Sequence, residues 1–300
     1  MASILIRSRK KKSPETDKLS ALPIIGAHVS TAGGLERALD NAKTIGARAI
    51  QIFGSSPQRW QTAFPDEKTV ADFLRLKQAA DNFPVYLHAG YLVNLASDNP
   101  ELRKRSVKNL TEHLKIAGLL SAQGLIFHAG SSNGSPKESG LKNLISGVKE
   151  VLRGPGEAKL LLENSAGGGN KLCSTLEEIS KVTRGIKDER FAICFDTAHA
   201  FEAGIIQYLD SVEVKKFFSD WDKLIGLEKL DVIHANDSKT DFRSNHDRHE
   251  NIGAGKIGSG GFRHLTGEKR LQNKIWILEV PGADDSGPDK ENIDKLASLF

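Results

Sequence analysis

The segment from Gly124 to Glu163 reads GLIFH at residues 124–128, LKNLISGVKEVL at residues 141–152 and KLLLE at residues 159–163. The two short runs are almost wholly apolar, as is usual for strands of a parallel sheet that is covered on its outer face. The run between them repeats its apolar residues every three to four positions, which predicts an amphipathic helix. The segment therefore predicts a strand, a helix and a second parallel strand.

The same alternation extends in both directions along the chain. Eight strands are expected, at Ile24–His28, Ala49–Phe53, Val85–His88, Gly124–His128, Lys159–Glu163, Phe191–Asp196, Leu230–His234 and Lys274–Glu279. Amphipathic helices are expected at Leu35–Ile45, Val70–Asn82, Leu102–Leu120, Leu141–Leu152, Leu176–Val182, Val212–Ile225, Phe262–Leu271 and Lys290–Leu299. Eight such units indicate an α/β fold, a closed (β/α)8 barrel, and a doubly wound open sheet is the alternative.

The composition agrees with one barrel domain over residues 24–300. Of the 300 residues, 39% are hydrophobic and 27% are charged, and a single barrel of this kind takes roughly 250 residues. No apolar run approaches the roughly 18 residues of a membrane helix, so no membrane span is expected. Two cysteines are too few for a disulfide scaffold and favour a reducing, intracellular compartment. Cys194 lies inside an apolar strand and is expected in the core.

The excess of positive charge lies in the first 23 residues. They hold six basic side chains against Glu15 and Asp17, which accounts for the whole formal charge of +4. The barrel region is therefore neutral by count, and its charge gives no sign of a basic nucleic-acid-binding body. Residues 1–23 are expected to form a solvated, disordered tail.

Side chains that can bind metals or protons end six of the expected strands. The motifs are VYLHAG, GLIFHAG, LLLENS, ICFDTAH, DVIHAND and WILEVPG. In a barrel, the carboxyl ends of the strands converge on the mouth where active sites form. An unpaired carboxylate or imidazole at the end of a buried strand is costly unless a partner or a metal satisfies it. We therefore expect these side chains to meet in one site.

Nine residues in these motifs and in the later HDRHE segment are candidate metal ligands: His88, His128, Glu163, Asp196, His199, His234, Asp247, His249 and Glu279. Imidazoles and carboxylates without cysteine suit Zn²⁺, Mn²⁺ or Fe²⁺. A catalytic zinc usually takes three protein ligands, so nine residues would serve about three ions, with one carboxylate bridging two. Three divalent ions also relieve the repulsion among four crowded carboxylates.

Two local patterns and the remaining histidines refine this set. Asp196 and His199 are three apart in FDTAH, which can aim them at adjacent ions, and Asp247 and His249 flank Arg248 in HDRHENIGAGKIG. The arginine is left free for a phosphate. Among the other histidines, His28 is expected to hydrogen-bond in the site and His246 to lie beside the Asp247 loop. His113 and His264 are expected on the surfaces of helices.

These motifs resemble those of the endonuclease IV family of apurinic/apyrimidinic-site endonucleases. The motifs GAHVSTAGG, YLHAGYLVNLAS, GLIFHAGSS, LLLENSAGGG, ICFDTAHAFEAG, IHANDSK, DRHENIGAGKIG and WILEVPG occur in family order from about Ile24 to about Pro281. The resemblance implies a xylose-isomerase-like TIM barrel that hydrolyses the phosphodiester 5′ to an abasic site in double-stranded DNA. The products would be a 3′-hydroxyl and a 5′-deoxyribose phosphate, and removal of 3′-blocking groups is also expected.

The resemblance also implies three zinc ions, with Mn²⁺ or Fe²⁺ able to take part of the set. One ion would be held by His88 and His128, and Glu163 would bridge it to a second. The other ligands of the second ion would be Asp196, His234 and Glu279, and those of the third would be His199, Asp247 and His249. Ions held in this way acidify water and stabilise charge on phosphorus, and Glu163 would be the catalytic carboxylate.

The expected DNA contacts lie on loops that follow two strands and in the DRH motif. Tyr91 and Leu92 occupy positions whose side chains enter the duplex in the family, where an aromatic and an aliphatic wedge replace lost stacking. The alternative is that Tyr91 packs into the protein. Gln58 stands where family members commonly carry an inserting arginine, with Arg59 next to it, so Arg59 takes that role or lesion opening is weaker. Arg248 is the expected phosphate contact.

Two other functions remain open. A metal-dependent sugar isomerase or epimerase would share the fold and the strand-end Glu, Asp, His and Glu, but would leave the DRH loop unexplained. A non-catalytic binding module would not need nine ligand-type residues. For the nuclease, we expect a monomer, because one barrel closes its own site, and a location with the DNA, in the cytoplasmic nucleoid or, in a eukaryote, the nucleus.

Overall fold

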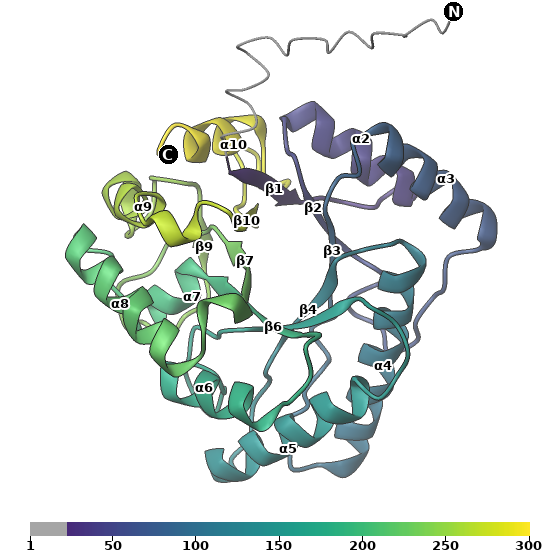
Figure 1. Ribbon diagram of the computed structural model, residues 1–300, viewed down its shortest axis with the longest axis horizontal. Coiled ribbons are helices and arrows are strands. Elements are labelled where there is room, and N and C mark those ends of the chain that lie inside the picture. Colours follow the sequence, from purple (N-terminus) through teal and green to yellow (C-terminus); the bar gives the residue numbers. More distant parts are fainter. Residues whose placement is uncertain (1–22) are drawn as a thin grey trace, which may run out of the picture.

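The computed structural model describes residues 23–300, and eight parallel strands in it close into a barrel. In chain order they are β1 (Ile24–His28), β2 (Ile50–Phe53), β3 (Val85–His88), β4 (Gly124–His128), β5 (Lys159–Glu163), β6 (Phe191–Asp196), β7 (Leu230–His234) and β10 (Ile275–Leu278). Strand β1 pairs with β2 on one side and with β10 on the other, which closes the sheet (Figure 1). The predicted barrel is confirmed, and six strands have the predicted bounds.

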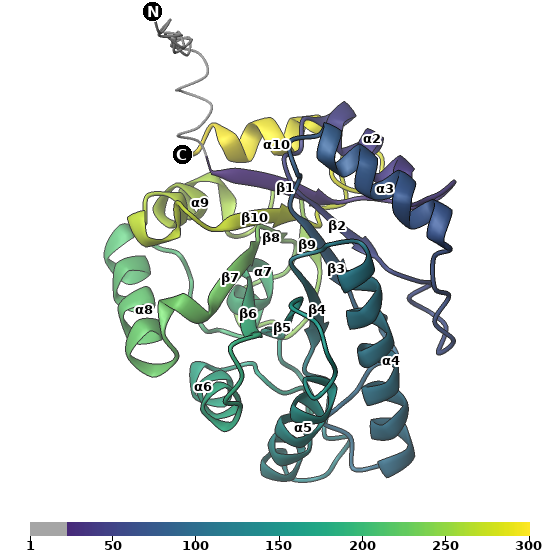
Figure 2. The ribbon, with the colours of Figure 1, turned by 45° about the vertical axis from the view of Figure 1, so that its right-hand side comes forward.

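Helices alternate with the strands and cover the outside of the barrel (Figures 1 and 2). They are α2 (Leu35–Ile45), α3 (Glu67–Ala79), α4 (Pro100–Leu119), α5 (Lys137–Val151), α6 (Leu176–Gly185), α8 (Ser211–Leu224), α9 (Gly258–Thr266) and α10 (Lys290–Ala297). Single turns of 3-10 helix, η1 (Leu227–Lys229) and η2 (Lys269–Leu271), precede β7 and β10. The helix expected at Phe262–Leu271 is thus α9 followed by η2.

Two short features that carry the site were not expected from the sequence. Helix α7 (Thr197–Glu202) follows β6 directly, and strands β8 (Asp237–Ser238) and β9 (His249–Glu250) form an antiparallel ribbon after β7. Elements of two to six residues are too short for a period of 2 or 3.6 to be read from their sequence.

Side-chain caps explain why two helices begin earlier than expected. The Asp66 carboxylate accepts a hydrogen bond of 2.7 Å from the Thr69 amide at the start of α3. At the start of α4, Asn99 accepts from the Glu101 amide at 2.9 Å, and Pro100 occupies the first turn. Such caps contribute about 1 kcal/mol each. The first turns are polar, so apolar spacing alone places these helix starts too late.

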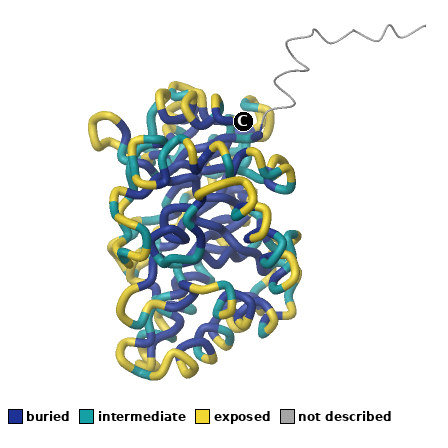
Figure 3. The backbone as a smooth tube through the Cα atoms, turned by 90° about the vertical axis from the view of Figure 1, so that its left-hand side faces the viewer, coloured by how far each residue is buried: buried dark blue, intermediate teal, exposed yellow. Residues whose placement is uncertain are grey.

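The barrel interior is filled by a layer of side chains below the strand ends. Tyr86, Ile126, Leu161, Ala192, Cys194, Val232 and Ile277 form this buried cluster. Successive side chains on a strand point to opposite faces, so the residue two positions further on points inward again. On the strands of this layer those next inward positions are His88, His128, Glu163, Asp196, His234 and Glu279. The apolar layer therefore forms the floor of a polar mouth, and burial increases toward the interior (Figure 3).

The expected surface position of His113 is wrong. His113 is buried on α4, where its Nδ1 lies 2.9 Å from the backbone oxygen of Asn109. It shares a face with Leu110 and Ala117, which are three and four positions away and fully buried. Burial lowers the pKa of this imidazole. The expected core position of Cys194 is confirmed, since it is buried.

The tail expected over residues 1–23 lies outside the described residues, apart from Pro23. That proline is buried, and its carbonyl accepts a long hydrogen bond of 3.5 Å from the Arg48 guanidinium. Within residues 23–300, no helix has both the length and the apolar character that crossing a bilayer requires.

We predict that Gly26→Ala lowers the free energy of unfolding by about 1–3 kcal/mol. A Cβ at Gly26 would lie 2.5 Å from the backbone oxygen of Ala49, the residue just before the neighbouring strand β2, so backbone must shift. Gly118→Ala is the control, because a Cβ at this exposed position of α4 meets nothing within 4 Å, and helix propensity favours alanine by about 0.5–1 kcal/mol. Urea unfolding measures both, and equal stability of the two variants would contradict the prediction.

Candidate metal centre

Six of the nine expected ligands lie at one end of the barrel: His88, His128, Glu163, Asp196, His234 and Glu279. Neighbouring strands hold them in register, since His128 pairs with Glu163 and Asp196 pairs with His234. Paired residues of neighbouring strands lie about 4.8 Å apart, so their side chains come within reach of a common ion. The expectation that strand-end residues gather in one place is thus met by the fold.

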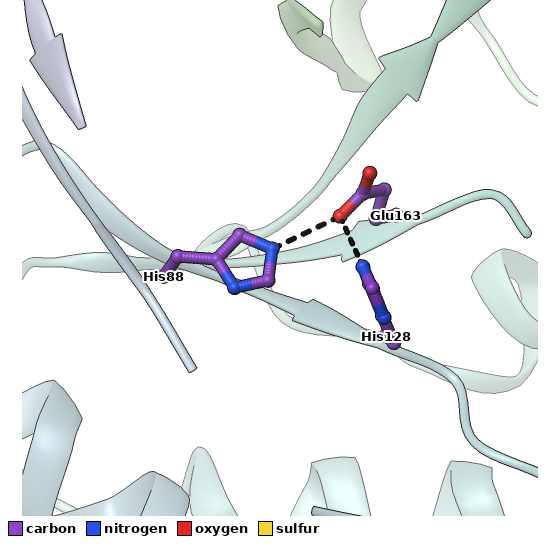
Figure 4. Close-up of side chains that lie close together, drawn as sticks. All are labelled: His88, His128 and Glu163. Atoms are coloured by element: carbon purple, nitrogen blue, oxygen red, sulfur yellow. Dashed lines mark hydrogen bonds and ion pairs between the residues drawn. The ribbon is translucent and has the colours of Figure 1, made fainter. Parts of the chain in front are cut away.

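The Glu163 carboxylate lies at the centre of this group and is fully buried. Its Oε2 atom is 3.1 Å from His88 Nε2 and 2.9 Å from His128 Nε2 (Figure 4). Its Oε1 atom is 3.1 Å from His234 Nδ1 and 3.3 Å from His199 Nδ1. Each oxygen therefore faces two imidazoles, as a carboxylate that bridges two ions would.

A second set of donors surrounds His234. Its Nδ1 lies 3.1 Å from Glu279 Oε2 and 3.8 Å from Asp196 Oδ2, in addition to the Glu163 contact. Three carboxylates packed around one buried imidazole repel one another unless protons or cations separate them. The single positive charge that His234 can carry does not balance the negative charges of three carboxylates.

The third set joins α7 to the loop that leads into β9. Asp196 caps α7 by accepting a 2.7 Å hydrogen bond from the His199 amide, which places His199 beside the strand that ends at Asp196. Asp247 Oδ2 lies 3.2 Å from His199 Nε2, and Asp247 Oδ1 lies 3.6 Å from His249 Nε2. Asp196 Oδ2 is 3.7 Å from the same His249 atom.

The donor atoms fit divalent metal ions. They fall into three sets whose ligand atoms all lie within 4.8 Å of one another: His88, His128 and Glu163; Glu163, Asp196, His234 and Glu279; and Asp196, His199 and His249. Asp247, which was expected in the third set, contacts both of its histidines but lies outside it, and Asp196 stands in its place. The Nε2 atoms of His199 and His249 are buried and make no aligned hydrogen bond, although buried polar atoms nearly always have one. The chemistry of the donors and these two nitrogen atoms indicate a metal-binding site.

Two amide side chains, Gln51 and Asn236, orient the ligands, and neither was expected from the sequence. The fully buried Gln51 accepts a 2.7 Å hydrogen bond from His234 Nε2 and donates to Glu279 Oε1 at 2.5 Å. Asn236 donates to Asp196 Oδ2 at 2.7 Å and accepts from the Glu279 amide at 2.8 Å. The signal for Gln51 was a lone amide in the apolar run AIQIF. Such partners fix ligand orientation and support metal affinity.

His28 contacts the ligand cluster, whereas His246 and His264 do not belong to it. His28 Nδ1 lies 3.2 Å from Glu279 Oε1, so it contacts the site as expected. His246 is exposed in the loop before Asp247, and His264 is half-buried on α9. These two stand apart from the three donor sets.

Asp237 holds the far part of the ligand-bearing loop. Its buried carboxylate accepts hydrogen bonds from the amides of Gly253 at 2.9 Å, Gly255 at 3.1 Å and Ile257 at 2.9 Å. At Gly255, a Cβ would lie 2.4 Å from the Ser238 carbonyl, so the close approach requires glycine. The glycines of NIGAGKIG therefore let backbone amides converge on one carboxylate.

The charges of the cluster shift its pKa values strongly. Burial would raise the pKa of Glu163, but the charges of His128 and His234 hold it well below its usual range. Burial would lower the pKa of His199, but Asp196 and Asp247 raise it well above its usual value. Without metal, the carboxylates therefore raise the pKa values of His128, His199 and His234 and favour their protonated forms.

A groove of about 1210 Å³ opens over the cluster. Arg59, Phe64, Tyr91 and Arg248 are among the residues that line it, whereas Gln58 is exposed outside the lining. Tyr91 is 67% exposed, and its ring meets the edge of Phe53 at a centroid distance of 5.8 Å. This exposure excludes the alternative in which Tyr91 packs into the protein.

Leu92 lies outside the groove wall, and Phe64 lies in it. Leu92, next to Tyr91, is 37% exposed, but it is not part of the groove wall. Phe64 was missed by the sequence analysis. It is 48% exposed on the groove wall, and nothing in the sequence around it distinguishes it from a core phenylalanine.

Comparison with known proteins gives relatives along nearly the whole chain. Residues 39–299 match a protein family described as xylose isomerase-like TIM barrel. A "Probable endonuclease 4" of Halothermothrix orenii is 38% identical over 279 residues, covering 89% of this chain and 96% of the relative. A protein of the same name from Persephonella marina is 36% identical over 281 residues, covering 92% of this chain and 96% of the relative.

Solved structures give the same picture. The crystal structure of endonuclease IV from Thermus thermophilus is similar to this chain with a TM-score of 0.81 and 32% identity, covering 92% of this chain and 98% of that one. A D-tagatose 3-epimerase-like protein matches with a TM-score of 0.66 and 19% identity, covering 92% of this chain and 94% of that one. At that identity the second likeness shows the fold alone.

We predict that protein stripped of divalent ions loses stability as the pH rises from about 6.5 to about 8. The raised pKa values of His199 and His128 mean that their ion pairs stabilise the folded state below about 6.5 and that this contribution is lost as the pH rises through the folded values. The carboxylates with lowered pKa values add no slope, because they are ionised in both states in this range. Urea unfolding in chelator measures the trend.

The control for this prediction is His246→Asn, which removes an exposed histidine and keeps the slope. His199→Asn should reduce the slope and leave the part that comes from His128. Stability that stays constant or rises over this pH range in the stripped protein would contradict the prediction.

Proposed function

Because the chain belongs to the endonuclease IV family, we propose that it is a DNA-repair hydrolase that cleaves the phosphodiester 5′ to an abasic site. The products would be a 3′-hydroxyl and a 5′-deoxyribose phosphate, and the same chemistry at a strand end would remove 3′-blocking groups. The observation that carries the proposal is the central position of Glu163, with two imidazoles at each oxygen, at the base of an open groove.

We propose three metal ions, principally Zn²⁺, with Mn²⁺ or Fe²⁺ able to occupy part of the set. His88 and His128 would hold the first, Glu163 would bridge it to a second with Asp196, His234 and Glu279, and His199, Asp247 and His249 would hold the third. Asp196 lies close enough to His249 to approach the third ion as well. Such ions supply Lewis acidity at the phosphate and lower the pKa of a water molecule.

The protein's own residues would orient the substrate around this centre. Arg248 lies between two ligands, lines the groove and has its guanidinium held at 2.7 Å by the Asp247 carbonyl. A guanidinium at this point can bind a phosphate through two hydrogen bonds. Glu163 is the catalytic carboxylate, because both of its oxygens face donors of the cluster and none of its surface is open to solvent.

Recognition of the lesion is assigned to Tyr91 and Arg59 on the groove wall and to Leu92, which lies next to Tyr91 in the chain. An exposed aromatic ring such as Tyr91 can replace stacking lost when a nucleotide leaves the duplex, and Leu92 is the aliphatic neighbour. Arg59 lines the groove while Gln58 does not, which favours Arg59 in place of the family's inserting arginine. We propose a double-stranded abasic duplex as the partner, and a monomer that acts inside the cell on genomic DNA.

A sugar isomerase is the weaker candidate. It would use Glu163, Asp196, His234 and Glu279, which form one set. It leaves without a role the donors His199, Asp247 and His249, and two buried imidazole nitrogens among them have no aligned hydrogen bond. The family relationship at 36–38% identity also supports the nuclease.

We predict that the purified protein cuts a duplex with one tetrahydrofuran site and that a chelator abolishes this cut. Glu163→Gln should lower the rate on the order of 10³-fold, because an amide presents a donor where the carboxylate presents its second oxygen. Glu213→Gln is the control. The Glu213 carboxylate accepts hydrogen bonds from the backbone amides of Gln207 and Leu209, just before α8, and it lies outside the donor sets. Incision that resists chelation, or that survives Glu163→Gln, would refute the proposal.

We further predict that Arg59→Ala weakens binding to the abasic duplex about tenfold and lowers the slope of log affinity against log salt by about 1. Gln58→Ala should change neither quantity, because Gln58 lies outside the groove wall. Fluorescence anisotropy at several salt concentrations, in chelator to prevent cleavage, measures both. A larger loss for Gln58→Ala than for Arg59→Ala would reverse the assignment.

A further inference from the structure

A buried carboxylate outside the donor sets links the two segments that carry the third set of ligands. Glu202 is the last residue of α7, one helical turn after His199, and it is fully buried. Burying a carboxylate is costly unless it accepts hydrogen bonds or faces a cation. Within residues 23–300, no lysine, arginine or histidine forms an ion pair with it. Its cost must therefore be offset by the hydrogen bonds that it accepts.

All of the hydrogen bonds to this side chain converge on one oxygen. Glu202 Oε1 accepts from the Ser238 hydroxyl at 2.7 Å, the Thr240 hydroxyl at 3.3 Å and the Arg248 amide at 3.2 Å. The other oxygen, Oε2, is buried and makes no hydrogen bond within the described part of the chain. The Glu202 backbone carbonyl accepts a fourth bond, of 3.0 Å, from the Asn245 amide.

The donors belong to the loop that delivers Asp247 and His249. The Arg248 amide lies between these two ligands in the chain, and Asn245 lies just before them. On the other side of the loop, the Lys239 amide donates to the Arg248 carbonyl at 2.9 Å. Arg248 is thus fixed from both sides, by Glu202 through its amide and by Lys239 through its carbonyl.

The arrangement sets the distance between α7 and the loop. His199 stands on α7, and Asp247 Oδ2 lies 3.2 Å from its Nε2. The Arg248 amide, next to Asp247 in the chain, joins this segment to α7 through Glu202, whereas the pairing of His249 with Ser238 joins it to β8. Asp237 anchors the loop further on, at residues 253–258, and so does not fix this contact. Metal ligands must be held to a few tenths of an ångström for tight binding.

We propose that Glu202 is a positioning residue that holds the Asp247–Arg248–His249 segment against His199 and thereby sets the affinity of the third metal site. This inference rests on the proposed function, since it takes the three-ion assignment as given. Glu202 lies outside the three donor sets and does not line the groove. It acts through the Arg248 amide.

The test is zinc binding by the full chain, with unfolding measured alongside. The stripped protein, Glu202→Ala, Glu202→Gln and Glu213→Ala are titrated with zinc against a chromophoric chelator, and bound zinc is counted by elemental analysis. We expect three ions in the unaltered protein. Glu202→Ala should keep two and bind the third about 10–100-fold more weakly, as for loss of a residue that orients a ligand.

Two variants separate positioning from general stability. Glu202→Gln keeps a carbonyl oxygen that can accept the same three bonds, so it should hold the third ion close to the affinity of the unaltered protein. Glu213→Ala removes a carboxylate on α8 that accepts hydrogen bonds from two backbone amides. This variant should keep all three ions even if it unfolds more easily. If Glu202→Ala does not fold, Glu202→Asp, which withdraws the oxygens by one methylene, should show the same selective loss.

The outcomes of the zinc titration distinguish the role of Glu202 from the three-ion assignment. Three ions at unaltered affinity in Glu202→Ala, with three in the unaltered protein, overturn the role of Glu202 and leave the proposed function standing. Fewer than three ions in the unaltered protein overturn the three-ion assignment and this inference with it. Equal weakening of all ions in Glu202→Ala also overturns the inference, because it marks a general loss of structure.

Discussion

Burial of one carboxylate among four imidazoles is the constraint around which this molecule is organised. Glu163 has no exposed surface, and its two oxygens face His88 and His128 on one side and His199 and His234 on the other. A buried anion is costly unless it faces positive charge or accepts several hydrogen bonds, and Glu163 faces imidazoles. In the metal-free protein the nearby carboxylates raise the pKa values of His128, His199 and His234, which favours positive charge there, and bound divalent ions would supply that charge instead.

The barrel makes this cluster possible by separating packing from chemistry along each strand. The inward residue of a middle layer, such as Tyr86, Leu161 or Cys194, packs with its neighbours, and the next inward residue carries an imidazole or a carboxylate. The period of two therefore places an apolar floor directly below the polar mouth. Water is excluded from below, while the groove leaves the cluster open to a large substrate from above.

The strands and the strand-borne candidate ligands could be predicted from the sequence because both follow from this period and from apolar runs several residues long. The surroundings of the site could not. Gln51 looks like filler in an apolar strand, and its role appears only when β1, β2, β7 and β10 lie together. The surface position expected for His113 is wrong because a histidine is polar enough to suit an exposed face, whereas its helical spacing places it on the buried face of Leu110. Glu202 lies in a helix too short to be recognised.

The nine candidate ligands consequently differ in how firmly they are held. Six of them follow strands whose register is fixed by the closed sheet, and their positions change only if the barrel changes. His199, Asp247 and His249 instead depend on a six-residue helix and a loop. Loops are held by fewer contacts than strands, so two buried carboxylates supply the missing rigidity. Asp237 accepts several backbone amides at residues 253–258, and Glu202 accepts the Arg248 amide together with two hydroxyls. Their burial is costly in itself, and the hydrogen bonds that offset this cost also confine the loop that completes the donor set.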